Sequence, residues 1–443
     1  MSRFILASLA ALTLLPGEAA AHAFGERYDL PLPLTLWLAA AGLAVALSFL
    51  VFALALRPGA SYRRIALLRL HPLVVAALRA VGVGVLFVLI AAGLFGTQDP
   101  FRNIAPAFVW IAWWIGFTYL TALVGDVWTL LNPWKALYPA EGFGLRRGLP
   151  AKVGVWPATG LLLAFAWIEI VWEGNAVPAN IAWLALGYSL LTWAGMFVFG
   201  REAWLHSAEM FTVYFGFLAR LAPAELRSGK WYLRPPAAGL LGARPVSTSE
   251  ASFVIVMLAI VTLDGLRETP LWAAGDALWT AATTAGLLAL PLLFALVILG
   301  ACALMTSLTG ASAGELARLF VPTLLPIALA YHVAHYLSYL LVAGQVVIPL
   351  ASDPLGRGWD LFGTARYQVA VGIVGARFAW YTSVAAIVAG HVLAMYVAHR
   401  LALARFRERR TARRSQYPLA ALMVAYTMLS LWILAQPIVE SGR

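Results

Sequence analysis

The chain has 443 residues, of which 62% are hydrophobic and 12% are charged. Because soluble domains carry roughly 25% charged residues, this composition excludes a soluble fold and indicates one membrane domain. The formal net charge of +11 suits either nucleic-acid binding or the cytoplasmic loops of a membrane protein, so the positions of the charges must decide. The single cysteine, Cys302, excludes an intramolecular disulfide and a thiolate metal cluster.

The N-terminus has the three parts of a secretory signal peptide. Arg3 precedes an apolar run over residues 4–15, and the small residues Ala19 and Ala21 follow a Pro-Gly pair. The apolar run is too short to cross a bilayer. We therefore expect residues 1–21 to be cleaved, and residues 22–443 to form a single polytopic membrane domain whose N-terminus lies outside the cytoplasm.

Ten apolar stretches follow the signal peptide. Each is long enough to cross a lipid bilayer as a helix, which satisfies its own backbone hydrogen bonds within hydrocarbon. The sequence therefore predicts an all-α membrane protein with about ten transmembrane helices. The expected spans are residues 32–56, 73–95, 105–125, 153–172, 179–199, 251–267, 283–308, 319–343, 377–398 and 418–438.

Most arginines and lysines fall in the loops on one side of these spans. Positive residues gather on the cytoplasmic side of membrane proteins, so we expect the loop at 400–417 to be cytoplasmic and the loop at 344–376 to be periplasmic. Both mature termini then lie in the periplasm of a bacterial cell, with the protein in the inner membrane. The basic balance needs no nucleic-acid partner, and the arginine cluster at 405–414 could bind anionic lipid.

The segment 201–223 is long enough to span but contains His206, Glu209 and Arg220. An eleventh span would invert every later loop and place the arginine cluster outside. If the segment replaced the span at 251–267, the basic residues of the loop at 223–250 would lie outside. We therefore expect a re-entrant or interfacial helix on the inner side, followed by 223–250 as the longest inner loop.

Histidines within the spans form the first candidate site. His332 and His335 are three residues apart, so they share a helix face and could bind one divalent metal ion. His391, in the next span, lies at a similar depth, and two antiparallel helices could bring all three imidazoles together. The alternative is that these histidines hydrogen-bond between helices and bind no metal.

A second polar group is expected near the inner face. Asp126 lies in the sequence GDVWTLLNPWK, and His206 and Glu209 have a spacing that places them on one helical face. A histidine and a carboxylate so placed could hold a metal or pair an acid with a base. Helix capping or a salt bridge would equally account for these residues.

The other candidates are isolated. Glu169 and Asp264 lie near the outer ends of their spans, where they could function or simply reach the headgroups. His22, at the expected mature N-terminus, could chelate copper. Ser312 lies in GASAG, which fits the G-x-S-x-G pattern of serine hydrolases, but no strand-forming sequence precedes it and the motif needs a strand, a turn and a helix.

Several segments together resemble a family of bacterial membrane proteins named fenitrothion hydrolase. These are HAFGERYDLPLPLTLWL, GDVWTLLNPWKAL, AYHVAHYLSYLLVAGQ, SDPLGRGWDLFGTA and AGHVLAMYVAHRLAL, which cover most of the expected mature chain. The resemblance implies a multi-span inner-membrane protein linked to hydrolysis of organophosphorus triesters. It carries over no catalytic motif, and the sequence lacks the H-E-x-x-H pattern of soluble zinc hydrolases.

Two functions fit these candidates. In a hydrolase, His332, His335 and His391 would hold a divalent metal that activates water, with Tyr331, Tyr336 or a carboxylate assisting, and a hydrophobic small molecule as substrate. In a transporter or metal-handling protein, the same histidines would bind an ion at the midplane, and Asp126 with His206 and Glu209 would form the inner exit. The chain shows no internal repeat typical of many carriers, and no hydrolytic signature either.

Overall fold

The computed structural model describes residues 28–57, 62–139, 142–242, 245–272, 276–406 and 408–440. In this part of the chain, ten helical segments are long and apolar enough to cross a membrane. They confirm the expected all-α membrane fold. The signal peptide expected at residues 1–21 and His22 lie outside the described residues.

The ten spans keep the expected order, and several are built from more than one helix. Each apolar stretch was expected to be helical because only helices satisfy their own backbone groups in hydrocarbon. The spans are α2 (Leu34–Ala55), α3 (Pro72–Phe95), α4 (Ile104–Pro106) with η2 (Ala107–Gly116) and α5 (Phe117–Val124), η3 (Ala151–Val153) with α8 (Trp156–Ile170), α9 (Pro178–Phe199), α12 (Thr248–Arg267), α13 (Asp276–Thr309), α14 (Ala313–Phe320) with η7 (Val321–Leu324), α15 (Leu325–Ala343), η8 (Gly344–Val346) and α16 (Val347–Ser352), α17 (Ala376–Arg405), and α18 (Arg409–Ser415) with α19 (Tyr417–Ala435).

Short elements connect the spans. They include five short strands among the described residues, which form a two-stranded and a three-stranded sheet. The connecting elements are β1 (Tyr28–Asp29), β2 (Ile65–Arg69), α6 (Trp128–Leu131), α7 (Pro133–Leu137), η4 (Glu173–Ala176), α10 (Arg201–Ser207), α11 (Met210–Ala219), β3 (Ala224–Arg227), β4 (Lys230–Leu233), η5 (Ala238–Leu240), η6 (Pro270–Trp272), η9 (Val371–Ile373) and β5 (Val439–Glu440).

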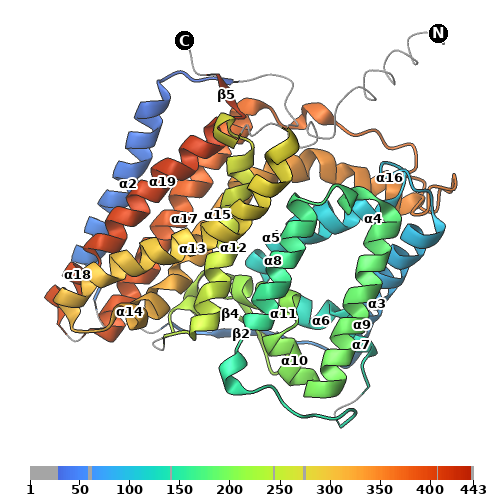
Figure 1. The fold of residues 1–443 in the computed structure, drawn as a ribbon, viewed down its shortest axis with the longest axis horizontal. Helices are drawn as coiled ribbons and strands as arrows, with labels where there is room; N and C mark the ends of the chain where they lie inside the picture. Colours follow the sequence, from blue (N-terminus) through green and yellow to red (C-terminus); the bar gives the residue numbers. More distant parts are fainter. Residues whose placement is uncertain are drawn as a thin grey trace.

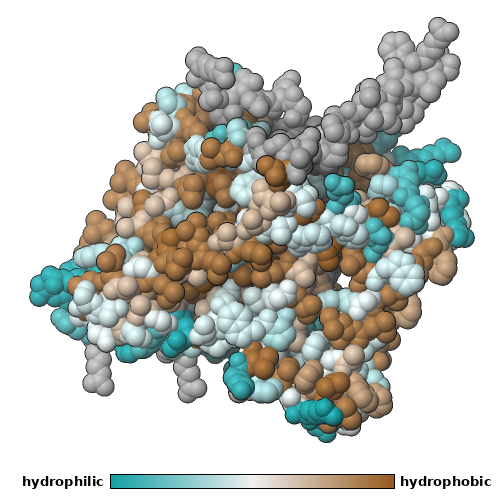
Figure 2. Space-filling model, in the orientation of Figure 1, coloured by the Kyte–Doolittle hydropathy of each residue, from teal (hydrophilic) through white to brown (hydrophobic). Residues whose placement is uncertain are grey.

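Helix α12 is the central span of the bundle (Figure 1). Its most apolar window is 83% buried, whereas that of α13 is 22% buried. Its start is fixed by a capping box in which Ser247 and Glu250 each accept a hydrogen bond from the other's backbone N–H. By contrast, α13 turns Leu292 and Leu296 outward, each about two-thirds exposed. Apolar residues cover the middle of this face and hydrophilic residues gather at its edges (Figure 2), as a bilayer requires.

Strand pairing decides which loops share a side of the membrane. The parallel pair of β1 and β5 joins the two ends of the described chain, which requires an even number of crossings between them. The antiparallel pairs β2–β4 and β3–β4 likewise join the loop before α3 to the loop after α11. Below, the side of β1 and β5 is the terminal side, and that of β2, β3 and β4 is the sheet side.

The segment at 201–223 therefore makes no net crossing. Four spans separate β2 from its partner β4, and a fifth would place these two paired strands on opposite sides. The segment forms α10 and α11, and the 10 residues of α11 would extend only about 15 Å. Most side chains of α11 are buried against other helices. Of the two expected alternatives, a re-entrant helix fits the buried α11 better than an interfacial one.

An ion-pair network holds the sheet-side loop in place. Arg234 donates hydrogen bonds to the carbonyls of Ala219 (2.7 Å) and Ala222 (3.2 Å), and lies 3.3 Å from the Glu225 carboxylate. Arg64 donates to the same carboxylate at 2.9 Å. Partial burial favours the neutral form of Glu225, but the two guanidinium groups outweigh it and lower the pKa of this carboxyl. The network links the loop before α3 to the end of α11.

Helices α15 and α17 approach closely at Gly390. A Cβ at this position would lie 2.2 Å from the Ala330 side chain and 2.8 Å from the backbone carbonyl oxygen of Pro326. Small residues allow such close contact between membrane helices, which is stabilised by van der Waals packing. The absence of a side chain at Gly390 thus sets the distance between the two helices that carry the predicted histidines.

We predict that Gly390→Ala destabilises the protein by about 1–3 kcal/mol, because the added methyl group meets backbone that cannot move aside. Unfolding in a denaturing-detergent titration would measure the change. The control is Gly300→Ala on α13, where a Cβ meets no heavy atom within 4 Å. Equal stability of the two variants would contradict the close approach of α15 and α17.

We also predict the sidedness of three exposed positions from the strand pairing. In a background with Cys302 replaced by alanine, cysteines at Arg63 and Lys230 should react alike with an impermeant thiol reagent in intact cells. A cysteine at Gln368, in the terminal-side loop before α17, should react oppositely. Opposite labelling at positions 63 and 230 would exclude the β2–β4 pairing.

Candidate functional site

A buried cluster of charged residues lies at the terminal-side end of α12. Arg267 lies 3.3 Å from one carboxylate oxygen of Asp264 and donates a 2.7 Å hydrogen bond to the carbonyl of Ile170 on α8. The second oxygen of Asp264 accepts a hydrogen bond from the Tyr336 hydroxyl and lies 3.1 Å from Nε2 of His335. The arginine thus ties α12 to α8, and the aspartate ties α12 to α15.

Glu268 adds a second carboxylate to this cluster. Its oxygen lies 4.0 Å from the same His335 nitrogen that contacts Asp264. The side chains of Asp264, Glu268 and His335 are between 8% and 13% exposed, so water reaches them only slightly. We call this group the carboxylate–arginine cluster; its members are Asp264, Arg267, Glu268, His335 and Tyr336.

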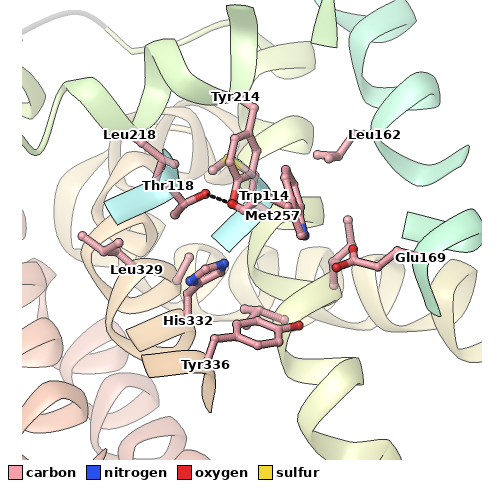
Figure 3. Close-up of a pocket in the computed structure, with 13 residues that line it drawn as sticks. Trp114, Thr118, Leu162, Glu169, Tyr214, Leu218, Met257, Leu329, His332 and Tyr336 are labelled. Carbon is pink, nitrogen blue, oxygen red and sulfur yellow. Dashed lines mark hydrogen bonds between the residues drawn. The ribbon is translucent and has the colours of Figure 1, made fainter. Parts of the chain in front are cut away.

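A small cavity adjoins the cluster. Its volume is about 30 Å³, and His332, Tyr336 and Glu169 share its wall with Thr118 and Tyr214. In Figure 3 the His332 ring and the Glu169 carboxylate point into the same space, and the hydroxyls of Thr118 and Tyr214 face each other. A cavity of this size holds an ordered water molecule when polar groups line it.

His332 is the least satisfied polar group on this wall. Both of its ring nitrogens are buried, and neither has a hydrogen-bond partner in the part of the chain that the structure describes. The ring packs instead against Tyr119 and Tyr336, with centroid distances of 5.3 and 4.7 Å. A buried imidazole without partners costs free energy, and water in the adjoining cavity would supply the missing hydrogen bonds.

The three predicted histidines do not form one ligand set. His332 and His335 share a face of α15 as expected, but His391 donates from Nδ1 to the carbonyl of Ile387 on its own helix at 2.8 Å. Its ring packs against Tyr426 of α19. Among the described residues, no three His, Cys, Asp or Glu side chains are placed to hold a metal ion. His391 lies at a depth similar to that of the other two histidines, but this does not bring the three rings together because the rotation of α17 directs His391 toward α19.

The two candidate tyrosines have different surroundings. Tyr336 belongs to the cluster and also lines the cavity. The Tyr331 hydroxyl is buried without a hydrogen-bond partner within the described chain and lies so close to Gly265 that a Cβ there would be 2.1 Å away. Tyr331 therefore packs against α12 and the apolar cluster around Leu431 and Ile433, outside the cavity.

The predicted pairing of His206 with Glu209 on one helical face is wrong. Helix α10 ends at Ser207, and Glu209 has an extended backbone conformation as the N-cap of α11. His206 is exposed and bonds the carbonyl of Glu202, whereas Glu209 is fully buried. Asp126 accepts hydrogen bonds from the backbone and hydroxyl of Thr129 and so caps α6.

Glu209 is the carboxylate with the most hydrogen bonds in the interior. It accepts from the Tyr188 hydroxyl at 2.6 Å and from backbone N–H groups at the start of α11. The side chains of Thr212, Trp128 and Asn132 also donate to it. These neutral donors and the helix N-terminus compensate the buried charge, and they fix α6, α9 and α11 relative to one another.

Glu169 and Asp264 are closer to the other charged residues than their positions in the sequence suggested. Both were expected either to function or to reach the headgroups, and the structure places them in the interior near Arg267. The i, i+3 spacing of Asp264 and Arg267, with Glu268 directly after, was the signal that could have identified the cluster. Ser312, in turn, caps α14 through a 3.3 Å hydrogen bond from the backbone of Glu315, which accounts for its place in GASAG.

Comparison of the chain with models of known families, with curated proteins and with solved structures gives no match.

We predict that the Asp264–Arg267 pair is strongly coupled. Removing the arginine leaves a carboxylate in apolar surroundings, so Arg267→Met should destabilise the protein by about 3 kcal/mol. Adding Asp264→Asn should restore about 2 kcal/mol, as measured by a double-mutant cycle in detergent.

The exposed pair Arg405–Glu315 provides a matched control. Its shortest N–O distance is 2.7 Å, but its side chains are 41% and 33% exposed. Coupling in this pair should stay below about 1 kcal/mol because water screens it. Additive effects at Asp264 and Arg267 would show that the buried pair has no special role.

Proposed function

We propose that this multi-pass membrane protein is a proton-coupled transporter, and that the carboxylate–arginine cluster with Glu169 binds the proton. The observation that supports this is the charge imbalance. Asp264 and Glu169 both lie near the same arginine, Arg267, at the end of a buried span. An uncompensated charge in hydrocarbon costs several kcal/mol. A proton bound to one of the carboxyl groups or to His335 is the simplest way to neutralise the excess negative charge.

The cavity next to the cluster gives this proton a route. Tyr336 contacts both the Asp264 carboxylate and the His332 ring, and His332 shares the cavity with Glu169. An imidazole with two unpartnered nitrogens can accept a proton on one and release it from the other. Water in the cavity would connect His332 to Glu169, so protons could move between the cluster and the interior of the bundle.

The sheet-side candidates have a smaller part in this proposal. Glu209 already accepts hydrogen bonds from several neutral donors, which supports an anchoring role more than an exit site. Asp126 caps a helix, and His206 lies at the surface. The basic residues of the sheet side also support an orientation, because positive residues gather on the cytoplasmic side of membrane proteins. The sheet side would then be cytoplasmic, with both termini in the periplasm of a bacterial inner membrane.

Hydrolysis of an organophosphorus triester with a divalent metal stays a prediction of the sequence resemblance. The cavity beside His332, at about 30 Å³, is large enough for water but not for a triester. Nitrophenyl phosphorothioate cleavage by purified protein, with several divalent metals and with His332→Ala as the comparison, tests this function. Cleavage that depends on both the metal and His332 would favour the hydrolase.

For the transporter, we expect the protein in liposomes to pass protons when a membrane potential is imposed. Asp264→Asn and Glu169→Gln should each lower the flux about tenfold, which corresponds to about 1.4 kcal/mol. A pH-sensitive dye inside the liposomes gives the rate. Glu315→Gln, at the exposed pair on the sheet side, should leave it unchanged.

Infrared spectroscopy tests proton binding without any need for a transported solute. The wild type should show a protonated carboxyl band that changes with pH, and Glu169→Gln or Asp264→Asn should remove or shift it. Glu315→Gln should not affect the band. If neither the flux nor the band responds to the two interior variants, the cluster is structural and the proposal fails.

A further inference from the structure

A groove runs along α9, away from the carboxylate–arginine cluster. Its volume is about 370 Å³, and its lining is mostly aromatic and aliphatic. Consecutive helices α8 and α9 stand apart in Figure 1. The lining residues are Trp172, Asn180, Trp183, Leu184, Gly187, Tyr188 and Leu191.

The groove lies at the depth of the hydrocarbon. It starts near Trp172 and Asn180, on the terminal side, and reaches Leu191 eleven residues further along α9. This length corresponds to about 16 Å at 1.5 Å per residue. Half of a hydrocarbon core of about 30 Å is about 15 Å, so the groove extends from one headgroup region to about the midplane.

Asn180 and Tyr188 in the lining already have hydrogen-bond partners. The amide of Asn180 donates to the carbonyl of Gly174 at 3.0 Å. The Tyr188 hydroxyl donates to Glu209 and accepts from the backbone of Met210 at 3.2 Å. What the groove offers to an occupant is therefore apolar surface, and Trp183 and Leu191 on its rim are 63% and 42% exposed.

We infer that this groove is a specific site for one phospholipid acyl chain from the terminal-side leaflet. An acyl chain from that leaflet would enter the groove at headgroup level, where tryptophan is commonly found. The length of the groove matches the distance from the headgroups to the midplane, which one acyl chain spans. A seated chain would contact Tyr188, which holds the buried Glu209 in place. The bound lipid would then support the packing between α9 and α11.

Gly187 allows the site to be blocked with little disturbance to the fold. It lies in the groove, and a Cβ there meets no heavy atom within 4 Å. Gly187→Phe would therefore place a ring in the groove, and its Cβ would meet no neighbouring heavy atom. Gly300→Phe on lipid-facing α13 is the matched control, because a Cβ at Gly300 is equally unobstructed.

The test uses the full chain in nanodiscs with a phospholipid that carries a photoreactive diazirine on its acyl chain. Mass spectrometry should find label on α9 at residues 180–191 about tenfold above label on α13, a preference of about 1.4 kcal/mol. Gly187→Phe should abolish that excess, and Gly300→Phe should retain it.

Three results would overturn the inference. Equal labelling of α9 and α13, or labelling of α9 that survives Gly187→Phe, would show only ordinary annular lipid. Equally strong labelling of α9 by a photoreactive alkane without a headgroup would show that the groove takes any apolar molecule. Transport variants at Asp264 or Glu169 should leave the labelling unchanged, so this result is independent of the proposed proton site.

Discussion

The fold depends on one constraint, which is that a charge inside the hydrocarbon must be neutralised where it lies. The protein meets it in two ways. Glu209 is surrounded by neutral hydrogen-bond donors and the start of α11, whereas Asp264 is paired with Arg267 and contacts His335 and Tyr336. The first arrangement has donors for both oxygens and holds helices together. The second pairs its carboxylate with an arginine beside a histidine and a tyrosine, and it is the site at which we propose that a proton binds.

The position of α12 explains why these charges could be buried inside the helix bundle. As the most buried span, it contacts α8, α13, α15 and α19 and has little surface left for lipid. Its polar residues therefore face other helices instead of acyl chains. Arg267 is held by a carbonyl of α8 and the ring of Trp279 at the start of α13, so one side chain joins three spans.

The spans and their number could be predicted from the sequence because each depends only on local length and hydropathy. The segment at 201–223 was also interpreted correctly as non-crossing, since positive charge restricts which loops lie together. Contacts between spans could not be predicted in the same way. The depth of His391 was calculable, but the rotation of α17 that turns it toward Tyr426 depends on packing at Gly390. The break at Ala208 that separates His206 from Glu209 has no strong sequence signal either.

The pairing of β1 with β5 has a consequence for how the protein is assembled. These two strands lie more than 400 residues apart in a chain that the ribosome delivers from one end. The hydrogen bond from Tyr28 to Ile438 can form only after the last span has entered the membrane. Strand β1 therefore has no partner strand until β5 has been synthesised. In a chain truncated before β5, it would stay unpaired. This contact forms only once α19 is in place, and its absence is a feature that a quality-control protease could recognise.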